Sequence, residues 1–259
     1  MDDTPRFLEQ GSGPRTLVFL HGISGAAAGW REPMTRFAAH GWRCLAWDMP
    51  GYGASPAVTE FRFPDLARLL GHMLDRAGIG EVTLVGHSMG GMVALEASVQ
   101  WPERVRALVL AATSPAFAGN DEAFRQRFLA QRLGPLDQGL TMAQLAARVL
   151  PASAGPVADP AGMALAADIM AAIPVPAYRA AMRCLTHFDR RPALPRLPMP
   201  TLCLAGEHDQ TAPPALMRRM AAHIPHARYT ELPATGHLMH FEQPDAFCEA
   251  VGAFVEVST

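Results

Sequence analysis

Lysine is absent from this 259-residue chain. All 22 basic residues are arginine, so neither a Schiff-base lysine nor the lysine of a phosphate-binding loop can take part in its chemistry. An excess of charge of one sign is also missing, because 24 acidic residues leave a formal net charge of −2. This balance excludes the basic footprint of a nucleic-acid-binding protein and a general attraction to anionic lipid. We therefore expect neither nucleic acid nor a membrane among its partners.

Long apolar runs are equally scarce. The longest mostly apolar stretch, residues 161–173, is interrupted by Asp168 and is too short to cross a bilayer. The N-terminal sequence MDDTPRFLEQGSG begins with two acidic residues after Met1 and has no apolar core, so it does not read as a signal peptide. The sequence thus predicts a cytoplasmic protein.

Cysteine is rare, and no two cysteines have C-x-x-C spacing. The four are Cys44, Cys184, Cys203 and Cys248. Cys44 and Cys203 lie inside apolar, strand-like segments. This placement predicts buried free thiols and neither disulfides nor a metal site.

Short apolar runs alternate with helical patterns along the chain. The strand-like segments are residues 16–20, 43–48, 82–86, 106–112, 201–206 and 228–232. Several of them are continuously apolar, which is typical of parallel strands covered on both faces. Apolar residues at three- and four-residue steps predict helices over residues 66–77, with Gly78 as the stop, and 246–254, after Pro244. The alternation predicts an α/β fold with a doubly wound, mostly parallel sheet.

The alternation breaks between about residues 115 and 195. This segment has no convincing strand, and residues 124–133, 141–150 and 176–185 have the pattern of short helices. We therefore predict a core of residues 1–115 and 196–259, and a helical cap of residues 116–195 inserted over the sheet. Ligands of open α/β sheets bind outside the carboxyl ends of the strands, so such a cap would shape the substrate pocket.

The stretch VTLVGHSMGGMVALE contains the pattern G-x-S-x-G, formed by Gly86, Ser88 and Gly90. A predicted strand precedes it and a helical pattern follows. In that setting a sharp turn holds the serine hydroxyl clear of the sheet, and the flanking glycines avoid collisions in the turn. Ser88 is therefore predicted to be a nucleophile; the alternative is a serine that only caps the helix. The preceding His87 is interpreted as structural.

A serine nucleophile needs a base, and the base needs an orienting acid. His237 lies in a glycine-led loop after the last predicted strand, and Asp209 lies in the loop after the strand before it. We predict His237 as the base and Asp209 as its orienting acid. Glu207 is interpreted as a solvated neighbour of Asp209, and His240 as a solvated or packing histidine.

An acyl-transfer site also needs donors for the oxyanion. The amide of Met89, at the start of the helix after Ser88, is one candidate. The second is the amide of Ile23 in VFLHGISG, where Gly22 and Gly25 permit close approach of the backbone. The alternative is a simple glycine-rich turn, and the serine motif favours the oxyanion interpretation.

Five segments resemble motifs of the α/β-hydrolases in order and spacing: LHGISG, DMPGYGAS, GHSMGG, GEHDQTAPP and GHLMHFEQPDAF. The resemblance covers about residues 16–114 and 197–255, while the middle segment resembles only a generic helical cap. Within the family the chain is most similar to small bacterial hydrolases of the 3-oxoadipate enol-lactonase type, with the meta-cleavage C–C hydrolases as neighbours.

The resemblance implies the α/β-hydrolase fold and a cofactor-free enzyme that cleaves a small ester or lactone. It carries the roles of nucleophile, base and orienting acid to Ser88, His237 and Asp209, and those of oxyanion donors to the Ile23 and Met89 amides. Two alternatives remain open. One is a C–C bond hydrolase of a ring-fission diketone, a branch that usually has asparagine before the serine; the other is a non-catalytic receptor for a small ligand.

Substrate contacts are harder to locate. In the cap segment RCLTHFDRR, Arg183, His187 and Arg190 are candidates for binding a substrate carboxylate, or they form an ordinary solvated face. Leu238, next to the predicted base, is a further candidate contact. The sequence leaves the oligomeric state open, with a homodimer among the options.

Overall fold

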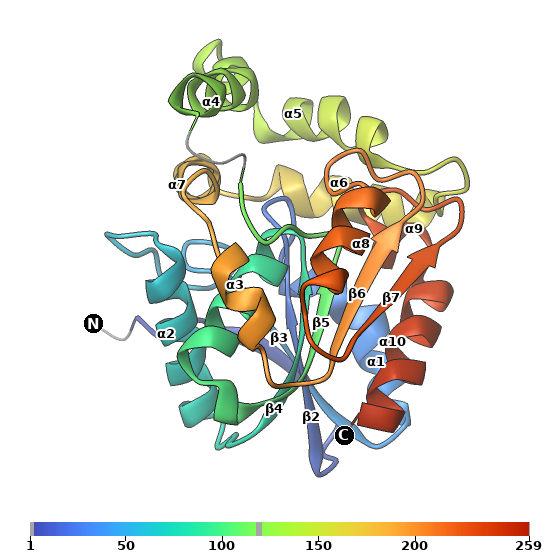
Figure 1. Cartoon of the computed structure of the whole chain (residues 1–259). Helices are drawn as coiled ribbons and strands as arrows, with labels where there is room; N and C mark the ends of the chain where they lie inside the picture. The colour runs from blue at the N-terminus through green and yellow to red at the C-terminus, as the bar shows by residue number, and fades with distance from the viewer. Residues whose placement is uncertain (1–2, 118–120, 259) are drawn as a thin grey trace.

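The computed structural model describes residues 3–117 and 121–258. Seven strands form one sheet: β1 (Phe7–Gln10), β2 (Arg15–Leu20), β3 (Trp42–Trp47), β4 (Val82–His87), β5 (Val105–Ala111), β6 (Thr201–Gly206) and β7 (Ala227–Leu232). Their order across the sheet is β1-β3-β2-β4-β5-β6-β7 (Figure 1). Only β1 runs antiparallel to its neighbour; the other pairs are parallel. The predicted doubly wound, mostly parallel sheet is confirmed, and β1 is a strand that the sequence did not indicate.

The continuous apolar runs arise because both faces of the sheet are covered. Successive side chains of a strand point to opposite faces. In β2, Leu17 and Phe19 join one hydrophobic cluster, and Val18 and Leu20 join another, all fully buried.

Five helices flank the sheet. On the first face lie α1 (Arg31–Ala39) and α10 (Pro244–Ser258); on the second lie α2 (Phe63–Arg76), α3 (Met89–Gln100) and α8 (Pro214–Ala222) (Figure 1). The α2 helix buries its apolar stripe, including Leu66, Leu70 and Met73. The predicted stop at Gly78 is confirmed, because Gly78 adopts a φ of +68° just beyond the helix.

Four helices lie between β5 and β6 in sequence and over the carboxyl ends of the strands: α4 (Glu122–Asp137), α5 (Met142–Val149), α6 (Pro160–Ala171) and α7 (Val175–Leu185) (Figure 1). Local signals start three of them. The Asp121 carboxylate accepts the Phe124 N–H at the start of α4. Thr141 and Gln144 form a reciprocal capping box at α5, and Asp159 caps α6 ahead of Pro160. Residues 1, 2, 118–120 and 259 of the predicted core and cap ranges lie outside the described residues.

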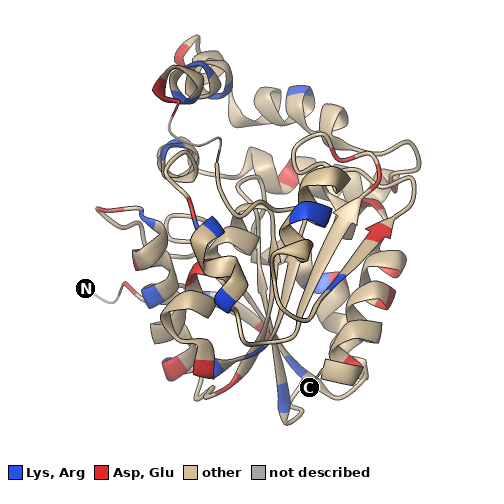
Figure 2. Cartoon of the chain, in the orientation of Figure 1, with Lys and Arg blue, Asp and Glu red and all other residues tan. Residues whose placement is uncertain are grey.

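Short helical segments complete the chain. They are η1 (Ala27–Trp30), η2 (Pro102–Arg104), η3 (Pro151–Ser153), η4 (Arg191–Arg196) and the single turn α9 (Met239–Glu242). Acidic and basic residues are interspersed over the helices (Figure 2). No single helix in the described ranges is long and apolar enough to cross a membrane; α6 and α7, which meet at 100°, satisfy that criterion only when taken together.

Candidate active site

Ser88 occupies the sharp turn between β4 and α3. Its backbone has φ 52° and ψ −120°, a strained conformation for a residue with a side chain. The end of β5 and the residues just after it hold this turn in place. The Ser88 N–H donates to the Ala111 carbonyl at 2.9 Å, and the Ser88 carbonyl accepts a hydrogen bond from Thr113 Oγ1 at 2.6 Å.

The two glycines of the motif are required for different reasons. A Cβ on Gly86 would lie 2.5 Å from the carbonyl oxygen of Gly90, so Gly86 makes room for the first turn of α3. A Cβ on Gly90 would lie 2.0 Å from the carbonyl oxygen of Leu20, so Gly90 lets α3 approach the end of β2. Together they allow the tight strand-to-helix turn that exposes the serine.

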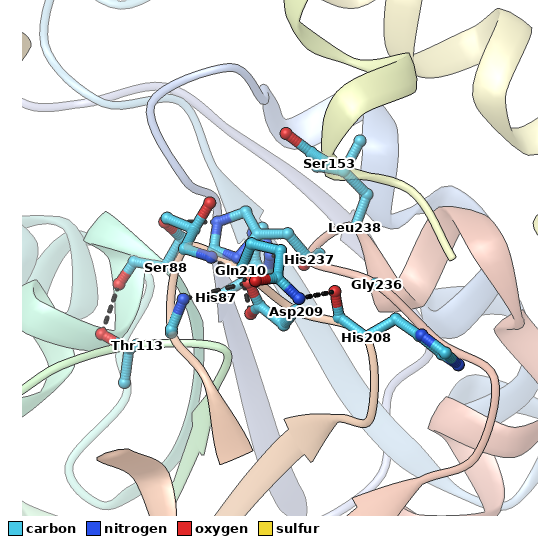
Figure 3. Close-up of polar contacts among 12 residues, drawn as sticks. His87, Ser88, Thr113, Ser153, His208, Asp209, Gln210, Gly236, His237 and Leu238 are labelled. Carbon is cyan, nitrogen blue, oxygen red and sulfur yellow. Dashed lines mark hydrogen bonds and ion pairs between the residues drawn. The ribbon is translucent and has the colours of Figure 1, made fainter. Parts of the chain in front are cut away.

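Ser88, His237 and Asp209 form one hydrogen-bonded chain (Figure 3). The Ser88 hydroxyl donates to Nε2 of His237 at 3.0 Å, and Nδ1–H of His237 donates to Oδ2 of Asp209 at 2.8 Å. The second carboxylate oxygen of Asp209 accepts the N–H groups of Thr211 and Ala212 at 2.7 and 3.0 Å. Three segments far apart in sequence therefore meet at the carboxyl edge of the sheet.

The environment keeps Asp209 ionised although its side chain is fully buried. Burial raises the pKa of this carboxyl, but the His237 ring and the hydrogen bonds from His237, Ala212 and Thr211 outweigh burial and lower the pKa below its usual value. A fixed carboxylate on Nδ1 selects the tautomer whose Nε2 is free to accept a proton. This is the arrangement that activates a serine hydroxyl.

The other candidates near the chain take structural positions. His87 is buried, and its Nε2–H donates to the His237 carbonyl at 2.7 Å, as the structural interpretation expected. Of the two interpretations of His240, the structure shows packing, because its ring stacks on Trp30 with centroids 4.0 Å apart. Glu207 is exposed and accepts the Ala234 N–H, so it does not reach His237.

The four cysteines offer no rival nucleophile. All four are buried and free of disulfides, and burial raises the pKa of each thiol to about 12. Thiols with such pKa values are not ionised at neutral pH.

The predicted oxyanion donors lie beside Ser88. Ile23 lines a small cavity together with Ser88 and His237, and Met89 is the first residue of α3. Within the described residues, neither the Ile23 nor the Met89 N–H has a hydrogen-bond acceptor in the protein. Gly22 lets the loop after β2 approach Ser88 closely, since a Cβ at Gly22 would lie 3.0 Å from the Ser88 Cβ. Two unpaired backbone N–H groups beside a serine hydroxyl are suited to binding an oxyanion.

Known proteins are similar to this chain in fold and in sequence. Residues 15–244 match the sequence family of the alpha/beta hydrolase fold. The chain belongs to the α/β hydrolase family. It is 29% identical over 246 residues to a Mycobacterium tuberculosis protein named as a non-heme bromoperoxidase, BpoC, with 92% of each chain covered. It is 30% identical over 254 residues to a pimeloyl-(acyl-carrier protein) methyl ester esterase of Yersinia enterocolitica, with 96% of each covered. The solved enol-lactonase of Burkholderia xenovorans superposes with a TM-score of 0.87 at 23% identity, covering 97% of this chain and 96% of that one.

A cavity of about 620 Å³ opens from Ser88 beneath the inserted helices of this α/β hydrolase. Its walls come from α4, α5, the end of α7 and the loop after β6. The lining includes Phe117, Phe128, Leu145, Val149 and Leu216.

Contrary to the prediction, Arg183 and His187 do not line this cavity. The α7 helix buries Tyr178 and Met182, so Arg183 faces solvent. His187 lines a separate cavity beside α2, and Arg190, the third candidate, pairs with Glu96 of α3 at 2.6 Å.

Leu238 occupies a different position. Its side chain is buried beside His237 and lines the small cavity that also contains Ser88 and Ile23. In Figure 3 it lies next to Ser153, on the side of the inserted helices. Its role as a substrate contact stays a prediction.

Sequence reasoning missed Glu242, which holds the loop of the predicted base. Its carboxylate is 1% exposed. It accepts the N–H groups of Gly236 and Leu238, the two neighbours of His237, and that of Gly155 from the inserted segment, each at 2.7 Å. One buried side chain thus fixes the backbone on both sides of His237 and ties it to the segment between α5 and α6.

We expect Glu242→Gln to lower both stability and the rate of serine acylation. Glutamine has one acceptor oxygen, and its NH₂ group would face backbone N–H donors, so at least one buried donor loses its partner at a cost of about 1–3 kcal/mol. We expect the free energy of unfolding to fall by about that amount, and the acylation rate of the folded protein to fall about tenfold or more, because small misplacement of a base is costly.

Urea unfolding and phosphonylation kinetics at low temperature measure the two effects of Glu242→Gln separately. Glu249→Gln, an exposed change on α10, is the matched control. An acylation rate that equals wild type in the folded variant would show that Glu242 does not position His237.

Proposed function

We propose that this protein is a serine hydrolase that cleaves a small carboxylic ester or lactone through an acyl-enzyme. The observation that carries the proposal is the continuous chain from Asp209 through His237 to Ser88, at 2.8 and 3.0 Å, facing a cavity of about 620 Å³. An esterase among its relatives and a lactonase of the same fold support this substrate class.

The reaction uses side chains of this protein and water. Ser88 Oγ attacks the substrate carbonyl while its proton passes to Nε2 of His237, and Asp209 stabilises the resulting imidazolium. The N–H groups of Ile23 and Met89 bind the oxyanion of the tetrahedral intermediate. The intermediate collapses, and the leaving alkoxide takes the proton from His237. Water, deprotonated by His237, then hydrolyses the acyl-enzyme and restores Ser88.

We also propose that residues 116–195 act as the cap of this enzyme. We further propose that the enzyme is cytoplasmic. Helices from this segment form the roof of the cavity over Ser88. A roof of this kind excludes water from the acyl-enzyme and selects among substrates.

A fluorophosphonate probe tests the proposal directly. We expect the probe to modify Ser88 alone, as mapped by peptide mass spectrometry, and Ser88→Ala to abolish both labelling and hydrolysis of short p-nitrophenyl esters and small lactones. Labelling that persists unchanged in Ser88→Ala would refute the assignment of the nucleophile.

A substrate panel separates the alternatives. Turnover of a ring-fission diketone in preference to every ester and lactone would favour the C–C bond hydrolase. Ligand binding without turnover of any class would favour a receptor.

A further inference from the structure

We infer that the substrate carries an anionic group, a carboxylate in the simplest case, which Arg132 of α4 and Arg148 of α5 bind at the cap side of the cavity. This inference rests on the proposed hydrolase function. It names the substrate class and two specificity-determining residues in place of Arg183 and His187.

The charge inside the cavity has one sign. Among the described residues that line it, Arg132 and Arg148 are the only charged ones, and no aspartate or glutamate is present. The remaining walls are mostly apolar, with Phe117, Phe128 and Leu145 among them. A cleft with low-dielectric walls and charge of one sign concentrates ligands of the opposite sign.

Neither guanidinium has a carboxylate partner in the described protein. Arg132 Nε is buried without any hydrogen-bond acceptor, and its guanidinium lies 5.5 Å from the centre of the Phe128 ring. Two other cap arginines are paired, Arg125 with Glu122 and Arg179 with Asp137, whereas Arg127 and Arg183 are exposed and do not line the cavity. Arg132 lines the cavity and has no carboxylate partner among the described residues, so its guanidinium is a charged group to which an anionic ligand can supply the counter-charge.

Arg148 lies at the rim of the same cavity. It is exposed, near the end of α5, and the chain continues from there to Ser153, whose carbonyl accepts the His237 N–H. The two arginines therefore come from different helices, and Arg132 is more deeply buried than Arg148. A ligand reaching from Ser88 toward the cap meets a partly buried guanidinium and a solvated one.

Guanidinium donors match the geometry of carboxylate and phosphate oxygens. The mostly apolar walls of the cavity suit a hydrocarbon spacer between the reacting group and the anionic group. The substrate class that follows is an ester or lactone with a carboxylate held away from the reacting carbonyl by a few carbons. The carboxylate can belong to the acyl part or to the alcohol part.

Matched substrate pairs test the inference. For the acyl side, mono-p-nitrophenyl esters of succinate, glutarate and adipate are compared with p-nitrophenyl esters of monocarboxylic acids of equal length. For the alcohol side, meta-acetoxybenzoate is compared with phenyl acetate. We expect a higher kcat/KM for the anionic member in at least one series, with an optimum chain length. We expect Arg132→Met to lower that anionic-to-neutral ratio by about 10- to 100-fold, the range for a lost charge-assisted hydrogen bond.

Arg148→Met should lower the ratio less than Arg132→Met does, and its effect should shrink with added salt, because exposed charges are screened. Arg127→Met, an exposed change on the same helix as Arg132, is the control and should leave the ratio unchanged. A ratio near one in wild type for every pair, or a ratio that survives Arg132→Met, would overturn the inference while leaving the hydrolase intact.

A binding experiment separates this inference from the proposed function. Adipate and glutarate are titrated calorimetrically into Ser88→Ala protein, with and without Arg132→Met. Binding that Arg132→Met weakens about tenfold or more supports the anion site even if no ester is turned over. If neither dianion binds and no anionic ester is preferred, the anion site does not exist.

Discussion

Replacing Asp209 by asparagine should lower kcat by about 10⁴-fold with little change in fold. The Oδ1 atom of Asp209 accepts two backbone N–H groups, and the asparagine oxygen can keep both. The Nδ2 group of asparagine then replaces Oδ2, which now accepts Nδ1–H of His237 at 2.8 Å. Because an amide NH₂ is a hydrogen-bond donor, Nδ1 of His237 must accept from it, and this requires the other tautomer of the ring. That tautomer carries the proton on Nε2, which can no longer accept the Ser88 proton.

Steady-state hydrolysis of a short ester, with burst kinetics to isolate acylation, measures the effect of Asp209→Asn. Thermal unfolding confirms that the variant is folded. Glu207→Gln is the matched control, since Glu207 lies in the same loop but is exposed and accepts the Ala234 N–H. A loss smaller than about tenfold in Asp209→Asn would mean that Asp209 does not orient the base.

Most of the sheet could be predicted because its central strands are buried on both faces. Every residue of β4 and β6 is buried, and such strands show up as uninterrupted apolar runs. The antiparallel edge strand β1 lacks this signal: it has four residues, none fully buried, and Glu9 is exposed. Its position depends on pairing with β3, a long-range contact without a local pattern.

The residues of the candidate site differ in how far local sequence determines them. Ser88, Asp209 and His237 each lie just beyond a predicted strand, and parallel strands bring their carboxyl ends to one edge. Cap contacts depend instead on how each helix is rotated in its packing. Arg183 adjoins the buried Met182 and yet faces solvent, whereas Arg132 on α4 faces the cavity. Helix packing, not the local charge cluster, decides which arginine faces the cavity.

The sequence did not indicate a role for Glu242, because that role depends on contacts that form only in the folded chain. In the sequence it is a glutamate before a helix. Only the folded chain places three N–H donors from two segments around it. Burial of a carboxylate without a basic partner becomes acceptable once those donors are present.

Three buried histidines should make the folded protein sensitive to acid. His21, His87 and His240 are each at most 4% exposed. Burial lowers the pKa of His21 to about 4, that of His87 to about 3, and that of His240 well below its usual value. Their contacts suit neutral rings. Nε2 of His21 accepts the Met49 N–H at 3.0 Å, and Nδ1 of His240 is buried with no hydrogen-bond partner among the described residues.

The direction of the pH effect follows from these pKa values. In the unfolded chain a histidine titrates near pH 6.5, so below that pH the unfolded state binds protons that the folded state excludes. The stability contributed by the neutral rings is complete above about pH 6.5 and falls as the pH drops toward about 4. Asp209 affects stability outside this pH window. Because its pKa is lowered in the folded protein, its contribution to stability is lost only when the pH falls below the usual range of carboxyl pKa values.

We therefore expect the free energy of unfolding to fall by about 4 kcal/mol per pH unit between about pH 6 and 4.5, the slope for three protons taken up on unfolding. A domain with a typical stability of about 5–15 kcal/mol would then lose most of it near about pH 4. Urea unfolding at pH steps from neutral downward measures the slope.

His240→Leu removes one titrating ring and should reduce the slope by about 1.4 kcal/mol per pH unit. His72→Gln, a change at an exposed position on α2, should leave the slope unchanged. A slope in His240→Leu equal to that of wild type would show that this buried ring does not take up its proton on unfolding, and would contradict the explanation.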